Sequence, residues 1–211
     1  MKIYNNFQYS ICVSKLSRIY SIKIQFVYLA SMKIILEHAT KTYKADLSKP
    51  LDISIPMFAS EKSVRAWYVD PLRIEPVVMG NWVAAVNSGA SVNFNNIFFN
   101  PHGHGTHTEC YGHISKEVLS INQALKQFAF TAKVCTIVPE LIENGDGVIQ
   151  LESLKESLGI EIPKAVIIRT SPNDIEKLIK NYSNSNPTYL DVKAAVWLRE
   201  QGVEQLLIDT P

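Results

Sequence analysis

Four of the chain's five histidines fall within one short window, residues 101–113. The histidines and the single carboxylate of this window are His102, His104, His107, Glu109 and His113. Imidazole nitrogen and carboxylate oxygen are donors that Zn²⁺ takes in proteins, and imidazole also carries protons near neutral pH. The grouping predicts a divalent-metal site with an acid–base histidine beside it.

The backbone of this window is predicted to be a loop that runs into an extended strand, because its glycines and its proline disfavour a helix. Alternate residues of a strand share one face, which places His107, Glu109, Tyr111 and His113 on the same side. His107 and Glu109 would then be roughly 6.6 Å apart at Cα, close enough to converge on one ion. His113 joins them only if the chain bends at Gly112, or it acts in proton transfer beside the metal.

Other interpretations of these residues remain open. A histidine-rich loop can be merely solvated or can bind adventitious metal. Thr106 and Thr108 can serve as cap or turn residues. Cys110 lies near His113 in sequence, but no third orienting group accompanies them, which favours packing over a thiol nucleophile. His38, alone in an apolar stretch, is typical of a structural histidine.

The elements that must position this window alternate between strands and helices. Short apolar runs bounded by Pro, Gly and Asn predict strands at 33–38, 77–79, 83–86, 94–99, 134–138, 165–169 and 206–208. Amphipathic spacing predicts helices at 120–130, 151–158 and 190–201. Residues 181–187 are expected to form a surface loop. The order implies crossover connections and an α/β fold with a partly parallel sheet, whose active groups are expected at strand ends.

Composition limits the function classes. A chain of 211 residues, 46% hydrophobic and 19% charged, can bury one sizeable core. Its 21 basic and 20 acidic residues are mixed along the sequence, so no field is available to hold a polyanion, and we expect no nucleic-acid partner. Three cysteines without paired spacing favour a reducing compartment, the cytoplasm.

Residues 1–31 carry basic side chains and no acid, a bias that resembles a targeting segment. Their apolar run, 24–30, is far shorter than the ~20 residues of a membrane span, and no membrane association is expected. We interpret 1–31 as a non-core extension that results from an upstream start or from a weak targeting segment. The folded domain is then expected to comprise residues 32–211, with Met32 as the natural start.

Residues 105–113, Gly-Thr-His-Thr-Glu-Cys-Tyr-Gly-His, resemble the HxGTHxDxPxH signature of the cyclase family, which includes bacterial kynurenine formamidases of tryptophan catabolism and isatin hydrolases. Asp-Leu-Ser-Lys-Pro-Leu at 46–51 is similar to the family's opening strand and turn. Residues 166–170 and 207–211 resemble two further family strands. The resemblance spans residues 34–211.

This resemblance implies a swivelling β/β/α domain with a mixed, partly parallel sheet, assembled as a homo-oligomer. It implies hydrolysis of a small aryl formamide or cyclic amide with one or two Zn²⁺ or Mn²⁺ ions. His107 corresponds to a metal ligand, Glu109 replaces a ligating Asp, and His113 corresponds to the proton shuttle. Physical chemistry agrees, since a divalent ion activates water and polarises a carbonyl, and a histidine can pass the proton to the leaving amine.

Three departures from the family pattern follow from the residues. The family's first histidine corresponds to Gly103, so His102 or His104 is expected to take its place. Glu109 and Tyr111 replace Asp and Pro, which indicates a subgroup whose substrate need not be N-formylkynurenine. No histidine follows His113, so we expect the later His and Glu ligands of the family to be lost by truncation. The alternative is a catalytically inactive cyclase-like fragment or binding module.

Overall fold

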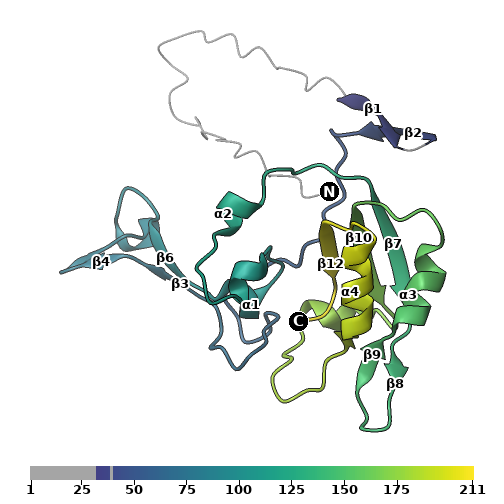
Figure 1. Ribbon diagram of the computed structural model, residues 1–211. Coiled ribbons are helices and arrows are strands. Elements are labelled where there is room, and N and C mark those ends of the chain that lie inside the picture. Colours follow the sequence, from purple (N-terminus) through teal and green to yellow (C-terminus); the bar gives the residue numbers. More distant parts are fainter. Residues whose placement is uncertain (1–31, 39) are drawn as a thin grey trace. The chain divides into compact units, whose positions relative to one another are not determined.

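The computed structural model describes residues 32–38 and 40–211, which divide into two compact units at Ile53 (Figure 1). The extension expected over residues 1–31 lies outside the described part. In the first unit, β1 (Lys33–His38) pairs with β2 (Lys41–Asp46) as an antiparallel hairpin. The strand predicted over 33–38 is confirmed.

The second unit contains a three-stranded parallel sheet in the order β12-β10-β7. Its strands are β7 (Ala132–Ile137), β10 (Ala165–Thr170) and β12 (Gln205–Ile208). Two helices, α3 (Leu151–Leu158) and α4 (Val192–Glu200), lie between successive strands in the sequence and run beside the sheet (Figure 1). The predicted α/β class, with crossover helices and a parallel sheet, is confirmed.

The core lies between this sheet and its two helices. The strands contribute residues that alternate along the chain, and the helices contribute one stripe each, as a half-covered sheet requires. The buried core residues are Cys135, Ile137, Ile149, Leu154, Leu158, Val166, Ile168, Ala194 and Leu198. Burial of each large aliphatic side chain stabilises the fold by about 1.5–3 kcal/mol. This core therefore fixes the C-terminal half of the unit.

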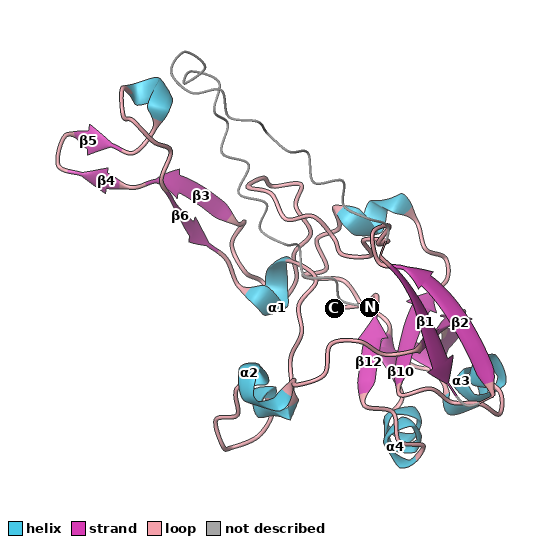
Figure 2. Cartoon of the chain, turned by 90° about the horizontal axis from the view of Figure 1, so that it is seen from above, coloured by secondary structure: helices cyan, strands magenta, loops and turns pink. Residues whose placement is uncertain are grey.

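Smaller sheets complete the unit (Figure 2). One contains β8 (Glu140–Leu141), β9 (Gly147–Ile149) and β11 (Tyr189–Leu190). The other two pair β3 (Arg73–Pro76) with β6 (Asn95–Phe98), and β4 (Val78–Met79) with β5 (Trp82–Val83). A 3-10 turn, η1 (Val86–Ser88), follows β5, and another, η3 (Ile175–Leu178), follows β10. We call residues 73–98 the β-arm.

The helix predicted over 120–130 is wrong in extent, because only one turn forms, α2 (Ile121–Ala124). The Ser120 side chain caps it by accepting a hydrogen bond from the Asn122 N–H. None of the residues of α2 is buried, and Phe128 remains 44% exposed. A helix of this length depends on tertiary packing of its apolar stripe, which is missing here. The helix predicted from residue 190 begins at Val192 because Leu190 pairs in β11.

No helix among residues 32–38 and 40–211 combines the length and the hydropathy that a bilayer crossing requires.

Candidate metal centre

The histidine window folds as two tight turns. Pro101–His104 forms one helical turn, α1, and the Asn100 Oδ1 caps it by accepting a hydrogen bond from the His102 N–H at 2.9 Å. The expectation of no helix here was wrong, because proline is well suited to the first helical position, where its missing N–H is not needed. The strand predicted over 107–113 is also wrong, since Tyr111–His113 forms a 3-10 turn, η2.

The η2 turn reverses the chain and returns His113 toward Glu109. The His113 N–H donates to the Cys110 carbonyl at 3.0 Å, which closes the turn. Gly112 permits this path, because a Cβ there would collide with the Leu119 carbonyl oxygen and would lie 2.8 Å from the Leu119 Cβ. The bend at Gly112 on which the sequence hypothesis for His113 depended is therefore present.

The Glu109 carboxylate is the centre of the group. Its Oε2 lies 3.1 Å from His102 Nδ1, 3.7 Å from His107 Nε2 and 3.9 Å from His113 Nδ1. The rings of His102 and His113 are stacked with centroids 4.2 Å apart, and His107 meets His102 edge-on at 4.9 Å. The structure thus brings four of the five predicted site residues together, and we call them the Glu109 group.

Three members of the Glu109 group fit a divalent ion. The ligand atoms of His102, His107 and Glu109 all lie within 4.8 Å of one another. Two ligands that bind one tetrahedral Zn²⁺ at about 2.0–2.1 Å are separated by roughly 3.3 Å. The separations of 3.1 and 3.7 Å from the Glu109 Oε2 lie on either side of that value. Two imidazoles and a carboxylate also form a donor set that Zn²⁺ and Mn²⁺ both accept.

A hydrogen bond sets the tautomer of His107. Its Nδ1 lies 2.9 Å from the Gly105 carbonyl oxygen, which can only accept. The ring hydrogen therefore belongs on Nδ1, and the lone pair of Nε2 faces Glu109. A metal-binding histidine usually shows this arrangement, with its second nitrogen donating to a carbonyl or a carboxylate.

His104 is not brought to the Glu109 group. Its side chain is buried, its Nδ1 accepts from the Asn100 N–H at 2.8 Å, and its Nε2 donates to the Asp70 carbonyl at 2.7 Å. Both ring nitrogens are therefore occupied by backbone partners. His104 therefore links α1 to the segment before the β-arm through its hydrogen bond with the Asp70 carbonyl.

Gly103, which corresponds to the family's first histidine, has no room for a side chain. A Cβ there would lie 2.7 Å from the Val69 Cγ2 and 3.1 Å from the Ala66 carbonyl oxygen. The neighbouring His102 instead reaches the Glu109 group from the exposed side of α1.

Two side chains that sequence reasoning left ambiguous have structural contacts. The Thr106 hydroxyl accepts a hydrogen bond from the Ile55 N–H at 3.0 Å, across 51 residues of sequence. The Cys110 Sγ lies 3.6 Å from the Leu119 carbonyl, on the far side of the η2 turn. No sequence signal predicts the Thr106 contact, because its partner is a backbone amide.

The carboxyl ends of the parallel strands hold a different polar cluster from the one expected there. The Asp209 carboxylate accepts from the Thr170 N–H at 3.0 Å, from the Thr170 hydroxyl at 2.9 Å and from Lys177 Nζ at 3.0 Å. Burial, and then the negative charge of Asp209, raises the pKa of the nearby Tyr182. The polar atoms of Asp209, Thr170 and Lys177 are thus hydrogen-bonded to one another. The Glu109 group lies elsewhere, in the loop after β6.

One comparison with known proteins gives a match. Residues 45–211 match the Cyclase family, which is described as putative cyclase, and the match includes the whole Glu109 group. No curated protein and no solved structure matches the chain. The family match extends over well more than half of the sequence, from β2 to the last residue. The chain belongs to the Cyclase family.

Proposed function

We propose that this chain is a metal-dependent hydrolase that cleaves the amide bond of a small aryl formamide or cyclic amide. His102, His107 and Glu109 hold Zn²⁺ or Mn²⁺ in this proposal, and His113 moves the proton. Family membership and the donor geometry of the Glu109 group support it. The finer fold assignment, a swivelling β/β/α domain, and a cytoplasmic location with free Cys110 and Cys135 belong to the same proposal.

One observation carries the proposal, the approach of three imidazole nitrogens to a single carboxylate oxygen. The separations of 3.1, 3.7 and 3.9 Å from the Glu109 Oε2 place nitrogen donors around one point. A solvated histidine-rich loop has no reason to gather its rings in this way. The hydrogen bond from His107 Nδ1 to Gly105 also directs a lone pair into the group.

A bound divalent ion would supply a water nucleophile at neutral pH and would polarise the carbonyl under attack. His113, 48% exposed at the edge of the group, would accept the proton of that water. The new C–O bond would form as the water attacks the carbonyl, and His113 would then deliver the proton to the amine nitrogen as the C–N bond breaks. The stacked His102 ring limits the tilt of His113 and keeps it beside Glu109.

The test uses the full chain loaded with Zn²⁺ or Mn²⁺, with metal content measured by mass spectrometry and hydrolysis measured on an aryl formamide. We expect one or two ions per chain, activity that a chelator abolishes, and Glu109→Gln that loses both metal and activity. Glu117→Gln is the matched control, since Glu117 lies outside the Glu109 group, and it should retain both. Full activity of a metal-free wild-type chain would contradict the proposal.

A second candidate is a catalytically inactive cyclase-like module that only binds metal or a partner. The exposure of the candidate ligands favours it, because the side chains of His102, His107 and Glu109 are 40%, 30% and 49% exposed. An open site lets water compete for the ion and holds it weakly. This candidate predicts metal that dialysis removes and no turnover on any aryl formamide, and measured hydrolysis by the 211-residue chain excludes it.

A further inference from the structure

The segment before the β-arm contains a tight turn with two aromatic residues at its tip. The Val69 N–H donates to the Ala66 carbonyl at 3.4 Å, and the two residues between them, Trp67 and Tyr68, have φ values of 60° and 59°. Positive φ at both central positions is typical of a type I′ turn, in which Asn-Gly and Asp-Gly are the preferred pairs. We call residues 66–69 the aromatic turn.

The aromatic turn holds two bulky residues in a conformation that is unfavourable for them. In the left-handed region the Cβ atom comes too close to the following carbonyl oxygen, so a residue other than glycine is strained there. Burial does not compensate for the strain, because Trp67 is 61% and Tyr68 is 73% exposed, whereas Val64 and Ala66 beside them are buried. Strained residues of this kind cluster at active sites and ligand-binding sites. The aromatic turn is therefore a candidate binding element.

The aromatic turn is attached to α1, the helical turn that carries His102. The Ala66 N–H donates to the Gly103 carbonyl at 2.9 Å. Trp67 and His102 are each next in sequence to a residue of this contact, so their Cα atoms lie within about 15 Å of each other. The side chains of Trp67 and His102, with one substrate ring between them, can bridge that distance.

The aromatic turn is also held from its other side by the connection between β10 and α4. The Tyr68 N–H donates to the Ser183 Oγ at 3.0 Å. Next to the turn, the Arg65 N–H donates to the Lys180 carbonyl and the Arg65 carbonyl accepts from the Tyr182 N–H. Because these contacts already order the backbone of the turn, a ligand that binds there pays little for ordering it.

We propose that the aromatic turn binds the aryl ring of the substrate while the amide carbonyl of the substrate lies at the metal. This inference rests on the proposed hydrolase function and names the element that selects aromatic substrates. Trp67 and Tyr68 offer rigid ring faces, and offset or edge-to-face packing of aromatic rings is favourable beyond the area that it buries. Turn geometry alone would favour Asn-Gly, which has no ring to stack.

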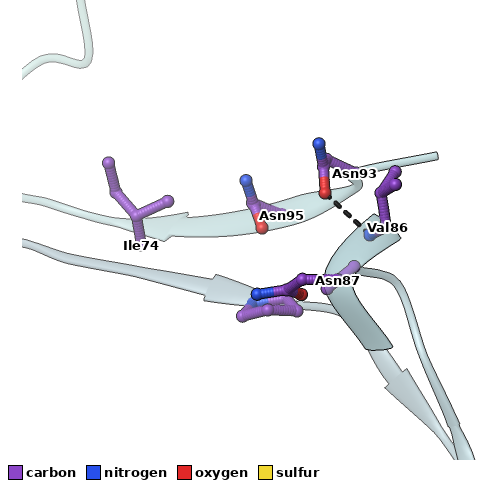
Figure 3. Close-up of a pocket in the computed structure, with 7 residues that line it drawn as sticks. Ile74, Val86, Asn87, Asn93 and Asn95 are labelled. Carbon is purple, nitrogen blue, oxygen red and sulfur yellow. Dashed lines mark hydrogen bonds between the residues drawn. The ribbon is translucent and has the colours of Figure 1, made fainter. Parts of the chain in front are cut away.

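The β-arm offers an alternative place for a ring and therefore an internal comparison. A hollow of about 660 Å³ opens there, lined by residues of β3, η1 and β6 that include Ile74, Val86 and Asn95 (Figure 3). None of its lining residues belongs to α1, to the aromatic turn or to the Glu109 group. A variant in this hollow thus separates uptake of a ring by any apolar surface from binding at the aromatic turn.

The test uses two hydroxamates, which chelate Zn²⁺ through their oxygen atoms and differ in whether they carry a ring. The full chain loaded with Zn²⁺ is titrated with benzohydroxamate and with acetohydroxamate in a calorimeter. A double variant, Trp67→Asn with Tyr68→Gly, should weaken benzohydroxamate binding by about tenfold and leave acetohydroxamate binding unchanged. Ile74→Ala, in the hollow of the β-arm, is the matched control and should leave both affinities unchanged.

Two further measurements separate loss of the rings from loss of the fold. Because Asn-Gly is the pair that a type I′ turn prefers, the double variant should unfold at the same or a higher urea concentration than the wild type. A second double variant, Trp67→Phe with Tyr68→Phe, keeps two rings and should keep its benzohydroxamate affinity within about threefold of the wild type.

Three results would overturn the proposal while the metal centre stands. They are equal benzohydroxamate affinity in the wild type and in Trp67→Asn with Tyr68→Gly, an equal loss in Ile74→Ala, and a parallel loss of acetohydroxamate affinity in the double variant, since the turn would then only support α1. A wild-type chain that binds no acetohydroxamate contradicts the metal centre itself, and the assigned role of the aromatic turn is then wrong as well.

Discussion

At the scale of single residues, four of the predicted side chains lie together, but for a reason other than the expected one. Alternation along a strand was expected to bring His107 and Glu109 together, but two tight turns do so instead. The choice between His102 and His104 was not predictable, because it depends on the direction in which each side chain leaves α1. For His104, that direction is set by the hydrogen bond to the Asp70 carbonyl, which lies 34 residues away in the sequence.

Separate alanine substitutions at His102 and His104 distinguish a ligand from a structural histidine. His102→Ala removes a proposed ligand. Loss of a group that only hydrogen-bonds a ligand weakens metal binding by about 10- to 100-fold, so His102→Ala should weaken Zn²⁺ binding by at least that factor, with little change in the free energy of unfolding. His104→Ala should lower the free energy of unfolding by about 1–3 kcal/mol, because the Asn100 N–H and the Asp70 carbonyl lose the buried ring that binds them both, while Zn²⁺ affinity is kept. Competition titration and urea unfolding measure both, and reversed results would make His104 the ligand.

At the scale of elements, the sequence predicts strands and helices that have a complete pattern of apolar residues, but it does not predict a helical turn whose stability comes from its N-cap. The strands β7 and β10 and the helix α3 were predicted within a few residues, because their apolar residues match the burial that the core requires. The turn α1 was missed because its stability comes from the Asn100 cap and from Pro101. A helix of four residues is too short to show a helical spacing of apolar residues in the sequence.

The Asn100 cap gives a prediction about α1. Asn100→Ala should lower stability by about 1 kcal/mol and should also weaken metal binding, because the His102 N–H loses its acceptor and the turn frays. Asn100→Asp keeps an acceptor oxygen at the same place and should preserve Zn²⁺ affinity. Zinc titration of both variants beside the wild type is the measurement. Equal affinity in Asn100→Ala would show that His102 does not depend on this cap.

At the scale of the whole second unit, a series of backbone hydrogen bonds connects the loop that carries the Glu109 group, residues 101–113, to the part of the chain that contains the parallel sheet. The Ala66 N–H donates to the Gly103 carbonyl at 2.9 Å, which links α1 to the segment before the β-arm. That segment continues the path, since the Arg65 N–H donates to the Lys180 carbonyl at 3.1 Å and its carbonyl accepts from the Tyr182 N–H at 2.7 Å. Residues 180–182 belong to the connection between β10 and α4. These contacts could not be predicted from residue types, because backbone groups of any residue can form them.

Metal bound at His102, His107 and Glu109 should therefore stabilise the whole unit and not only its own loop. At a free Zn²⁺ concentration 100 times the dissociation constant, the free energy of unfolding should rise by about 2.7 kcal/mol. Trp197 packs against the core, so in a chain that also carries Trp67→Phe and Trp82→Phe its fluorescence reports the unfolding of the sheet and helices rather than of the loop. The unfolding midpoint by this signal should rise with Zn²⁺ in the wild type and stay constant in Glu109→Gln. If hydrogen exchange slows only in residues 101–113 while the midpoint is unchanged, the loop opens independently and the contacts through Ala66 and Arg65 do not couple it to the core.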